Sequence, residues 1–118
     1  MIGGLGADRL VGNGGDDLEI GGRTAFDIDD DHLAAGFDQA ILAILAEWNS
    51  SRIYATRVSN IRGTGTGTRL NGSVFLNDTT VFDDSAVDVL TGSAGQDWFF
   101  FNPSQDQVTD KKSDESVN

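Results

Sequence analysis

Apolar residues in the middle of the chain recur at the spacing of one helix face. Between residues 31 and 48 they fall mostly three or four positions apart, at Leu33, Phe37, Ile41, Ile44, Leu45 and Trp48. This spacing predicts an amphipathic helix. One of the aspartates at 29–31 is expected to cap its N-terminus, where a carboxylate accepts bonds from unpaired amides. After a break at 49–51, a shorter second helix is predicted to end at Gly63.

The N-terminal end of the chain follows a period of nine residues instead. Residues 3–11 read Gly-Gly-Leu-Gly-Ala-Asp-Arg-Leu-Val, with glycine at positions one, two and four, aspartate at six and an apolar residue at eight. Residues 12–20 keep glycine at one and four and aspartate at six, but place Glu19 at position eight. A third repeat opens at Gly21 and then loses the pattern. The spacing predicts tight turns followed by short strands, because glycine adopts backbone conformations closed to other residues.

The same period returns, with fewer glycines, near the C-terminus. Residues 92–100 keep glycine at positions one and four, aspartate at six and an apolar residue at eight. In this register, position six holds Thr79, Asp88, Asp97 and Asp106, and position eight holds Val81, Leu90, Phe99 and Val108. A second repeat array is the favoured interpretation, and ordinary strands with surface aspartates are the alternative.

Together the two periods predict a mainly β fold with a helical insert, in which short parallel β-roll or β-helix coils accompany a two-helix segment. A length of 118 residues suits a single domain. Its expected parts are N-terminal repeats at 1–29, the helical insert at 30–62, a connector with strands at 63–82, C-terminal repeats at 83–110 and a flexible tail at 111–118. The helix pair is expected to cover apolar surface or a sheet edge.

Glycine and threonine alternate over residues 63–68, and this run has two interpretations. A flexible polar connector is favoured, since alternating glycine weakens a strand. The other is a flat threonine face for ice or sugar. Such a face needs threonines on successive coils, whereas here they lie in one stretch.

Charge and composition narrow the partners. Acidic residues number 19 against 8 basic ones, for a formal charge of −11, so phosphate backbones and anionic membranes are repelled. Nucleic acid is therefore not an expected partner. The chain has no cysteine, which leaves a hard cation bound by oxygen as the structural metal that fits. No apolar run approaches the roughly 20 residues of a membrane span, so none is expected.

Nothing in the chain has the spacing of an active site. There is no G-x-S-x-G elbow, no phosphate-binding loop and a single histidine, His32. Trp48 and Trp98 have apolar periodic neighbours and are expected in a core rather than on a sugar platform. The chain is predicted not to be an enzyme.

Residues 3–22 and 83–110 resemble the hemolysin-type calcium-binding repeats of the repeats-in-toxin family. The middle of the chain, with Ala46-Glu47-Trp48-Asn49-Ser50, Arg62 to Gly67, Leu70-Asn71-Gly72 and Thr80 to Asp84, resembles a segment that follows such repeats in large bacterial extracellular proteins. The resemblance implies a parallel β-roll, bound calcium ions, type I secretion of the unfolded chain and folding triggered by calcium outside the cell.

Calcium ligands follow from the same resemblance. The implied set is Gly3, Gly4, Gly6, Asp8, Gly12, Gly14, Gly15, Asp17, Gly21, Asp88, Gly92, Gly95, Asp97 and Asp106. Asp8, Asp17 and Asp97 match the motif directly, whereas Asp88 and Asp106 match only by register because the glycines around them are missing.

Asp27 and Asp29 complete the set of predicted ligands, since one or the other of them would complete the site that the turn of Asp8 begins. Together with Asp31 they also fit the first ligand positions of an EF-hand loop. That loop requires glycine where His32 stands and glutamate where Asp38 stands, so the EF-hand is disfavoured.

The resulting prediction is a non-catalytic calcium-binding module that folds with calcium and caps the C-terminal end of a secreted bacterial protein, outside the cell or at its surface. Its partners are calcium ions and the rest of the parent polypeptide. Two alternatives stay open. One is an adhesion module in which calcium shapes a surface for glycans or ice, and the other is a C-terminal secretion signal of a parent enzyme.

Overall fold

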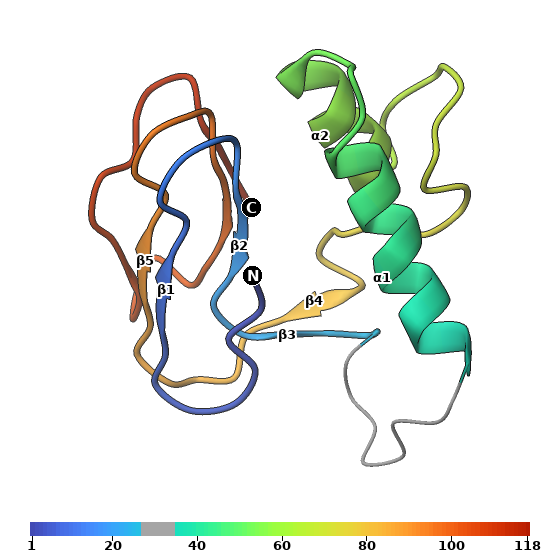
Figure 1. Ribbon diagram of the computed structural model, residues 1–118. Helices are drawn as coiled ribbons and strands as arrows, with labels where there is room; N and C mark the ends of the chain where they lie inside the picture. Colours follow the sequence, from blue (N-terminus) through green and yellow to red (C-terminus); the bar gives the residue numbers. More distant parts are fainter. Residues whose placement is uncertain (27–34) are drawn as a thin grey trace. The chain divides into compact units, whose positions relative to one another are not determined.

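A computed structural model describes residues 1–26 and 35–118 of the chain, which divides into two units (Figure 1). The first, the strand unit, consists of Met1–Thr24 and Val81–Asn118, and the second, the helical unit, of Ala25–Thr80. The predicted roles of Asp27 and Asp29, as ligands or as helix cap, concern residues outside the described ranges.

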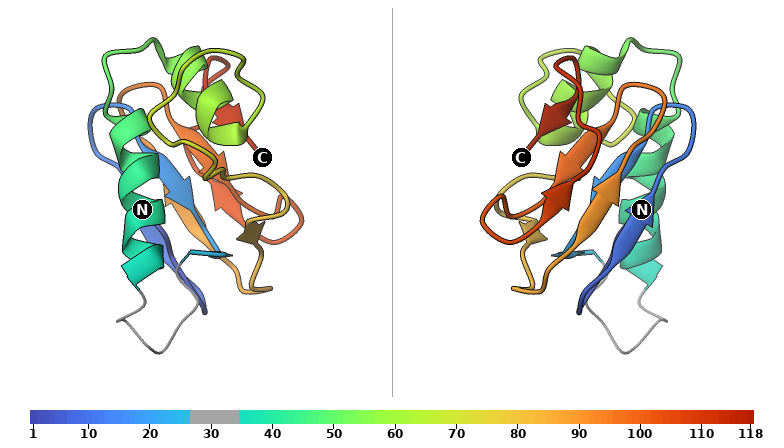
Figure 2. Two further views of the ribbon diagram at one scale, coloured as in Figure 1. Left: turned by 90° about the vertical axis from the view of Figure 1, so that its right-hand side faces the viewer. Right: turned by 90° about the vertical axis from the view of Figure 1, so that its left-hand side faces the viewer.

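The strand unit contains two parallel sheets, each built from both ends of the chain. One sheet has the order β1 (Arg9–Val11), β5 (Val89–Thr91), β7 (Gln107–Val108), and the other β2 (Leu18–Ile20), β6 (Trp98–Phe100), β8 (Ser116–Val117). Leu10 pairs with Leu90, which pairs in turn with Val108. Figure 2 shows the N-terminal strands in blue running beside the C-terminal strands in orange and red. Segments that lie far apart in the sequence are thus neighbours in the sheets.

Position eight of the repeats supplies part of the core of the strand unit. Leu90 and Phe99 are completely buried, as is Trp98, whose ring packs against Phe100 with centroids 4.7 Å apart. Burying apolar side chains of this size contributes about 1.5–3 kcal/mol each to folding. Glu19 occupies the same position and is also completely buried. A carboxyl group therefore stands at a position of the repeat where Leu90 and Phe99 bury apolar side chains.

A short antiparallel pair lies where the chain passes from the strand unit to the helical unit and returns. β3 (Arg23–Thr24) precedes the helical unit in the sequence and β4 (Val81–Phe82) follows it, with Arg23 opposite Phe82. The guanidinium of Arg23 lies 5.2 Å from the centre of the Phe82 ring, within the range of a cation–π contact.

Two helices form the helical unit, as the apolar spacing predicted. They are α1 (Ala35–Trp48) and α2 (Tyr54–Arg62). The second ends at Gly63, whose φ of +92° closes the helix with bonds from its N–H to Ser59 and Asn60. Residues 64–68 contain no helix or strand, as expected of a connector. No helix within the described ranges is long and apolar enough to cross a membrane.

A buried acidic group organises the helical unit. Glu47 is completely buried, and its carboxylate accepts bonds from the Asn60 side chain at 2.8 Å, the Leu70 amide at 2.6 Å and Arg52 at 3.2 Å. Asn60 is itself 2 % exposed. A carboxylate with this many donors is stable in a buried position.

The predicted fold class, mainly β with parallel β-roll or β-helix coils, is wrong. Within the described ranges the chain is an α/β fold with two helices and eight short strands, in parallel and antiparallel sheets. The nine-residue period located β1, β2, β5 and β6 correctly, because it reports which side chains face inward. It does not report strand pairing, which here joins the two ends of the chain. Residues 111–118, expected as a tail, include β8, which pairs with β6.

Candidate metal centre

The glycine at position one of each repeat turn faces a carboxylate oxygen. A Cβ atom on Gly12 would lie 2.4 Å from Oδ2 of Asp17, and one on Gly92 would lie 2.2 Å from Oδ2 of Asp97. The equivalent distance from Gly3 to Oδ2 of Asp8 is 2.9 Å. These separations are shorter than any normal contact with a Cβ. The glycine is therefore required so that the carboxylate can point at the turn.

A fourth turn of this kind is assembled from distant parts of the sequence. A Cβ atom on Gly21 would lie 2.7 Å from Oδ2 of Asp88. In the three other turns the glycine and the aspartate belong to the same nine-residue repeat. Here, by contrast, the whole helical unit separates Gly21 from Asp88 along the chain. The glycine that the sequence around Asp88 lacks is thus supplied by Gly21.

The position-six carboxylates are stacked through their other oxygen into two acidic columns. In the first column, Oδ1 of Asp88 accepts the amide of Asp8 at 2.8 Å, and Oδ1 of Asp106 accepts the amide of Asp88 at 3.0 Å. In the second column, Oδ1 of Asp97 accepts the amide of Asp17 at 2.8 Å. Each accepting carboxylate therefore has its Oδ1 fixed by a backbone amide of the neighbouring layer.

In Asp8, Asp17 and Asp88, the oxygen that faces the glycine, Oδ2, is buried without a hydrogen-bond partner. Burial raises the pKa of Asp88, and the nearby charges of Asp106, Asp84 and Asp8 raise it further against the hydrogen bond from the Asp8 amide. Burial also raises the pKa of Asp17. A buried polar atom that lacks a partner costs about 1–3 kcal/mol, and more when it is charged. The oxygens are arranged as acceptors for a positive group.

The glycines predicted as ligands divide into two groups by their role in the turn. Those at position one make room for the carboxylate. Others have a left-handed backbone, with φ of +98° for Gly4, +97° for Gly6, +99° for Gly15 and +141° for Gly95. Gly14 belongs to neither group, because it bridges to Ala94 and has open space at its Cβ position.

Asp106 differs from the other predicted aspartates. Its Oδ2 accepts the amide of Asn102 at 2.7 Å, while its Oδ1 accepts the amide of Asp88. Phe101 stands at position one of this turn, so no glycine faces the carboxylate. Both oxygens are already used, and Asp106 closes the first acidic column without offering a free oxygen.

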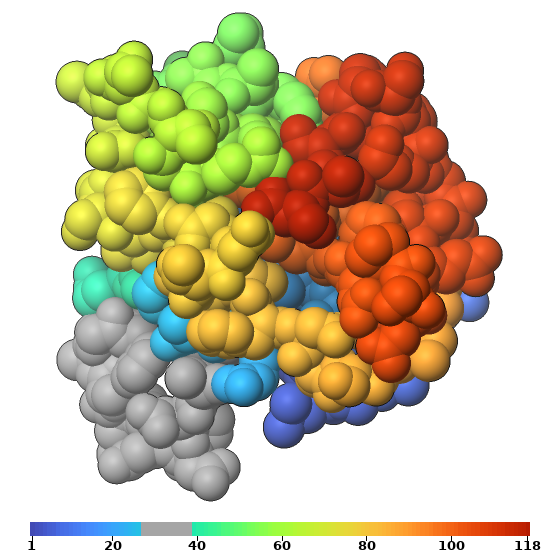
Figure 3. All heavy atoms as spheres, turned by 180° about the vertical axis from the view of Figure 1, so that it is seen from behind, coloured from blue at the N-terminus to red at the C-terminus, as the bar shows by residue number. Residues whose placement is uncertain are grey.

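Two acidic residues outside the predicted set also shape the turns. Asp84 accepts the Gly6 amide at 2.6 Å and the Ala86 amide at 3.1 Å, and these bonds hold its pKa below the usual range. The N-terminal segment, in blue, and the segment around residue 84, in pale orange, meet on one face in Figure 3. Asp110 accepts the amides of Gly92 and Ser93 at 3.1 and 2.7 Å.

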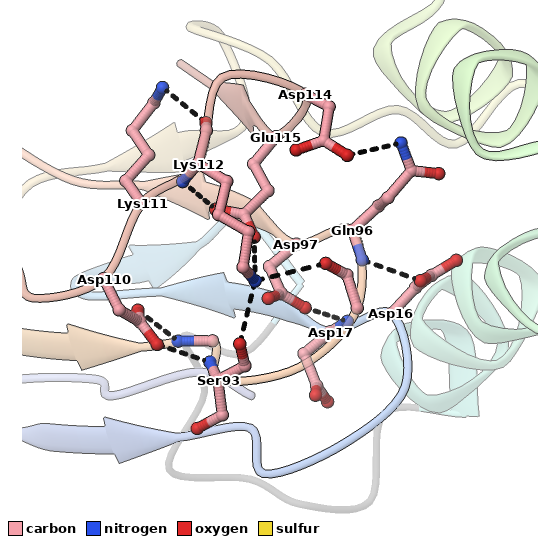
Figure 4. Close-up of polar contacts among 12 residues, drawn as sticks. Asp16, Asp17, Ser93, Gln96, Asp97, Asp110, Lys111, Lys112, Asp114 and Glu115 are labelled. Atoms are coloured by element: carbon pink, nitrogen blue, oxygen red, sulfur yellow. Dashed lines mark hydrogen bonds and ion pairs between the residues drawn. The ribbon is translucent and has the colours of Figure 1, made fainter.

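Glu115 also escaped the sequence prediction, although a signal for it exists. One further step of the nine-residue period from Asp106 leads to Glu115, at position six. Its side chain is 1 % exposed, and the next residue along the chain donates its amide to the carbonyl of Asp97. Glu115 therefore continues the second acidic column, close to Lys112 (Figure 4).

Glu19 is a buried acidic residue of the strand unit that stands at position eight rather than position six of its repeat. Both of its carboxylate oxygens are buried without a hydrogen bond of ordinary geometry. Burial raises its pKa to about 7, with smaller contributions from the charges of Asp17 and Asp97 in the same direction. The N-terminal amine and the backbone of Thr91 act in the opposite direction. Near pH 7 this carboxyl group is therefore partly protonated.

The donors of the two columns fit a calcium ion. Calcium takes carboxylate and main-chain carbonyl oxygens in a flexible arrangement. Asp8 and Asp88 would hold it beside the turns of Gly3 and Gly21, and Asp17 with Asp97 beside those of Gly12 and Gly92. Among the described residues, no three or more His, Cys, Asp or Glu side chains gather as a metal-binding group. A site here therefore needs main-chain oxygens as well as two carboxylates.

Searches of protein-family models, curated proteins and solved structures give no match to this chain.

Proposed function

We propose that this chain is a non-catalytic calcium-binding module of the repeats-in-toxin kind, whose strand unit is stabilised by calcium outside the cell. In the parent protein it would cap the C-terminal end of a secreted bacterial polypeptide. One observation carries the proposal. Buried Oδ2 atoms of Asp8, Asp17 and Asp88 have no hydrogen-bond partner and point at glycines that leave them room.

The electrostatics of the first acidic column favour a cation. Asp88 is completely buried between the neighbouring carboxylates of Asp8 and Asp106. Like charges at this proximity repel, and burial removes the water that would screen them. A divalent cation reverses the sign of both effects, because it neutralises the charge and supplies the missing partner for Oδ2.

The chemistry of the donors selects calcium over other metals. The chain has no cysteine and a single histidine, so soft or borderline metals would lack their preferred ligands. Magnesium requires near-ideal octahedral geometry and usually keeps several waters. Carboxylates beside glycine turns suit the larger and less demanding calcium ion.

Calcium binding would be coupled to folding. The ligands of each column come from opposite ends of the chain, as with Asp17 and Asp97, so an unfolded chain does not hold them together. A single site stabilises the folded state by about 2.7 kcal/mol when calcium is at 100 times its dissociation constant. Two such columns are enough to decide whether a domain of ordinary marginal stability folds.

The substitution Asp88→Asn tests the proposal, with Asp78→Asn as its control. Asparagine keeps the shape of the side chain and the Oδ1 acceptor but removes the buried charge. We expect Asp88→Asn to melt at a higher temperature than the wild type in excess chelator. Its melting temperature should rise much less than that of the wild type when calcium is added. Asp78 is exposed in the helical unit, so its variant should match the wild type in both conditions.

Thermal melts followed by circular dichroism, together with calorimetric calcium titrations, provide the measurement. Identical melting curves for the wild type in calcium and in chelator would refute calcium-dependent stability. Binding that saturates at micromolar rather than near-millimolar calcium would argue against an extracellular setting, where weak calcium modules operate at roughly 0.1–1 mM.

A further inference from the structure

At the end of the second acidic column, three oxygen atoms surround the side-chain nitrogen of Lys112. The ammonium donates to the carbonyl of Ser93 at 2.8 Å, to the carbonyl of Gly95 at 3.4 Å and to Oε1 of Glu115 at 2.9 Å (Figure 4). Two of these acceptors belong to the turn that begins at Gly92, and the third belongs to the next layer of the column. The ammonium therefore links two layers.

The turn that carries Lys112 lacks the features of the turns before it. Its first position is Asp110, and residues 110–115 contain no glycine. Asp110 uses its carboxylate for the amides of Gly92 and Ser93, so it leaves the centre of the turn to another group. Glu115 is at position six, where the earlier turns have aspartate. The longer glutamate reaches the ammonium of Lys112.

The acceptors of Lys112 are of the same chemical kind as calcium ligands, namely main-chain carbonyls and one carboxylate. An exposed salt bridge usually contributes little. This one differs because the Glu115 side chain is 1 % exposed, while the Lys112 side chain is 44 % exposed and can reach its partners from the surface. The hydrogen bond that Lys112 donates to Glu115 also raises the pKa of Lys112, which keeps the ammonium charged.

We propose that Lys112 is a built-in cation of the second acidic column, which holds the Gly92 turn and Glu115 together without metal and excludes a calcium ion from the position between the Gly92 turn and the turn that begins at Asp110. The calcium-free turn would fix the C-terminal edge of the strand unit before any ion binds. Removing the ammonium should then expose a calcium site made of the Ser93 and Gly95 carbonyls and the Glu115 carboxylate. The choice of calcium for that exposed site rests on the proposed function.

The substitution Lys112→Met tests this, with Lys111→Met as the matched control. Among the described residues, the ammonium of Lys111 donates only to the carbonyl of its neighbour Lys112, so its loss should change nothing. In chelator, Lys112→Met should melt several degrees below the wild type. With calcium chloride, native mass spectrometry should count one ion more per chain on this variant than on the wild type, and the melting deficit should disappear.

Two further variants keep the test decisive. Lys112→Arg retains a positive charge and should bind no additional ion. Adding Glu115→Gln to Lys112→Met should abolish the additional ion. An unchanged ion count for Lys112→Met, or a melting deficit that persists in calcium, would overturn the inference while leaving calcium binding by the wild type intact. If the wild type binds no calcium and Lys112→Met binds one ion, the proposed function is refuted and the inference about Lys112 is supported.

Discussion

Alanine at the position-one glycines should destabilise the strand unit in the order of the contacts that each new methyl group meets. A Cβ would lie 2.2 Å from Oδ2 of Asp97 at Gly92, 2.4 Å from Oδ2 of Asp17 at Gly12 and 2.7 Å from Oδ2 of Asp88 at Gly21. At Gly14 nothing lies within 4 Å, so Gly14→Ala is the control. The expected order of stability loss is Gly92→Ala, Gly12→Ala, Gly21→Ala and last Gly14→Ala.

The magnitude follows from how far each neighbour has to move. At Gly12 the new methyl group would also lie 2.6 Å from Cγ and 2.9 Å from Cβ of Asp17. Rotation of the side chain does not move its own Cβ, so the backbone must shift. Overpacking of this kind costs about 1–3 kcal/mol. At Gly14, alanine should stay within about 1 kcal/mol of the wild type and on the stabilising side, because it restricts the unfolded chain.

Urea unfolding in chelator measures this series, and a calcium titration of each variant shows whether the loss of stability is matched by a loss of affinity. With a slope of about 1–3 kcal/mol per molar urea, a cost of about 2 kcal/mol moves the midpoint by about 1 M. Equal stability of Gly12→Ala and Gly14→Ala would refute the inference that the glycine at position one makes room for the aspartate carboxylate. A neutral Gly21→Ala would separately refute the turn shared between Gly21 and Asp88.

Two predictions concern buried acids outside the columns. The pKa of Glu19 is raised from 4.5 to about 7, so the folded state binds more protons than the unfolded state between these values. The free energy of unfolding in chelator should therefore fall by about 1–3 kcal/mol as pH rises from 4.5 to 7. Glu19→Gln should flatten this pH dependence, which urea unfolding at several pH values measures. An unchanged pH dependence in Glu19→Gln would show that the buried acid is not its source. Asn60→Ala removes a hydrogen-bond donor to Glu47 and should lower the free energy of unfolding by about 1–3 kcal/mol, equally with and without calcium. A loss of stability that calcium repairs would contradict a purely structural role of Asn60 in the helical unit.

Local patterns in the sequence were sufficient for the two helices, for four of the strands and for part of the candidate site. Helix periodicity located α1 and α2, and Gly63 marked the end of the second helix, because these signals depend on neighbours within one or two turns. The nine-residue period brought out Asp8, Asp17 and Asp97 for the same reason, since each faces a glycine of its own repeat. One further step of the same period reaches Glu115, which is not among the predicted ligands.

The tertiary structure decided which residues share a turn and which oxygens stay available. Gly21 meets Asp88 although the helical unit lies between them in the sequence, a pairing that no local spacing encodes. Asp106 has the same place in the repeat as Asp88, yet the Asn102 amide occupies its second oxygen. The sequence by itself determined the kinds of groups along the chain and their local spacing. Strand pairing between the two ends of the chain determined their neighbours, and a carboxylate becomes a ligand, a column end or a lysine partner only through those neighbours.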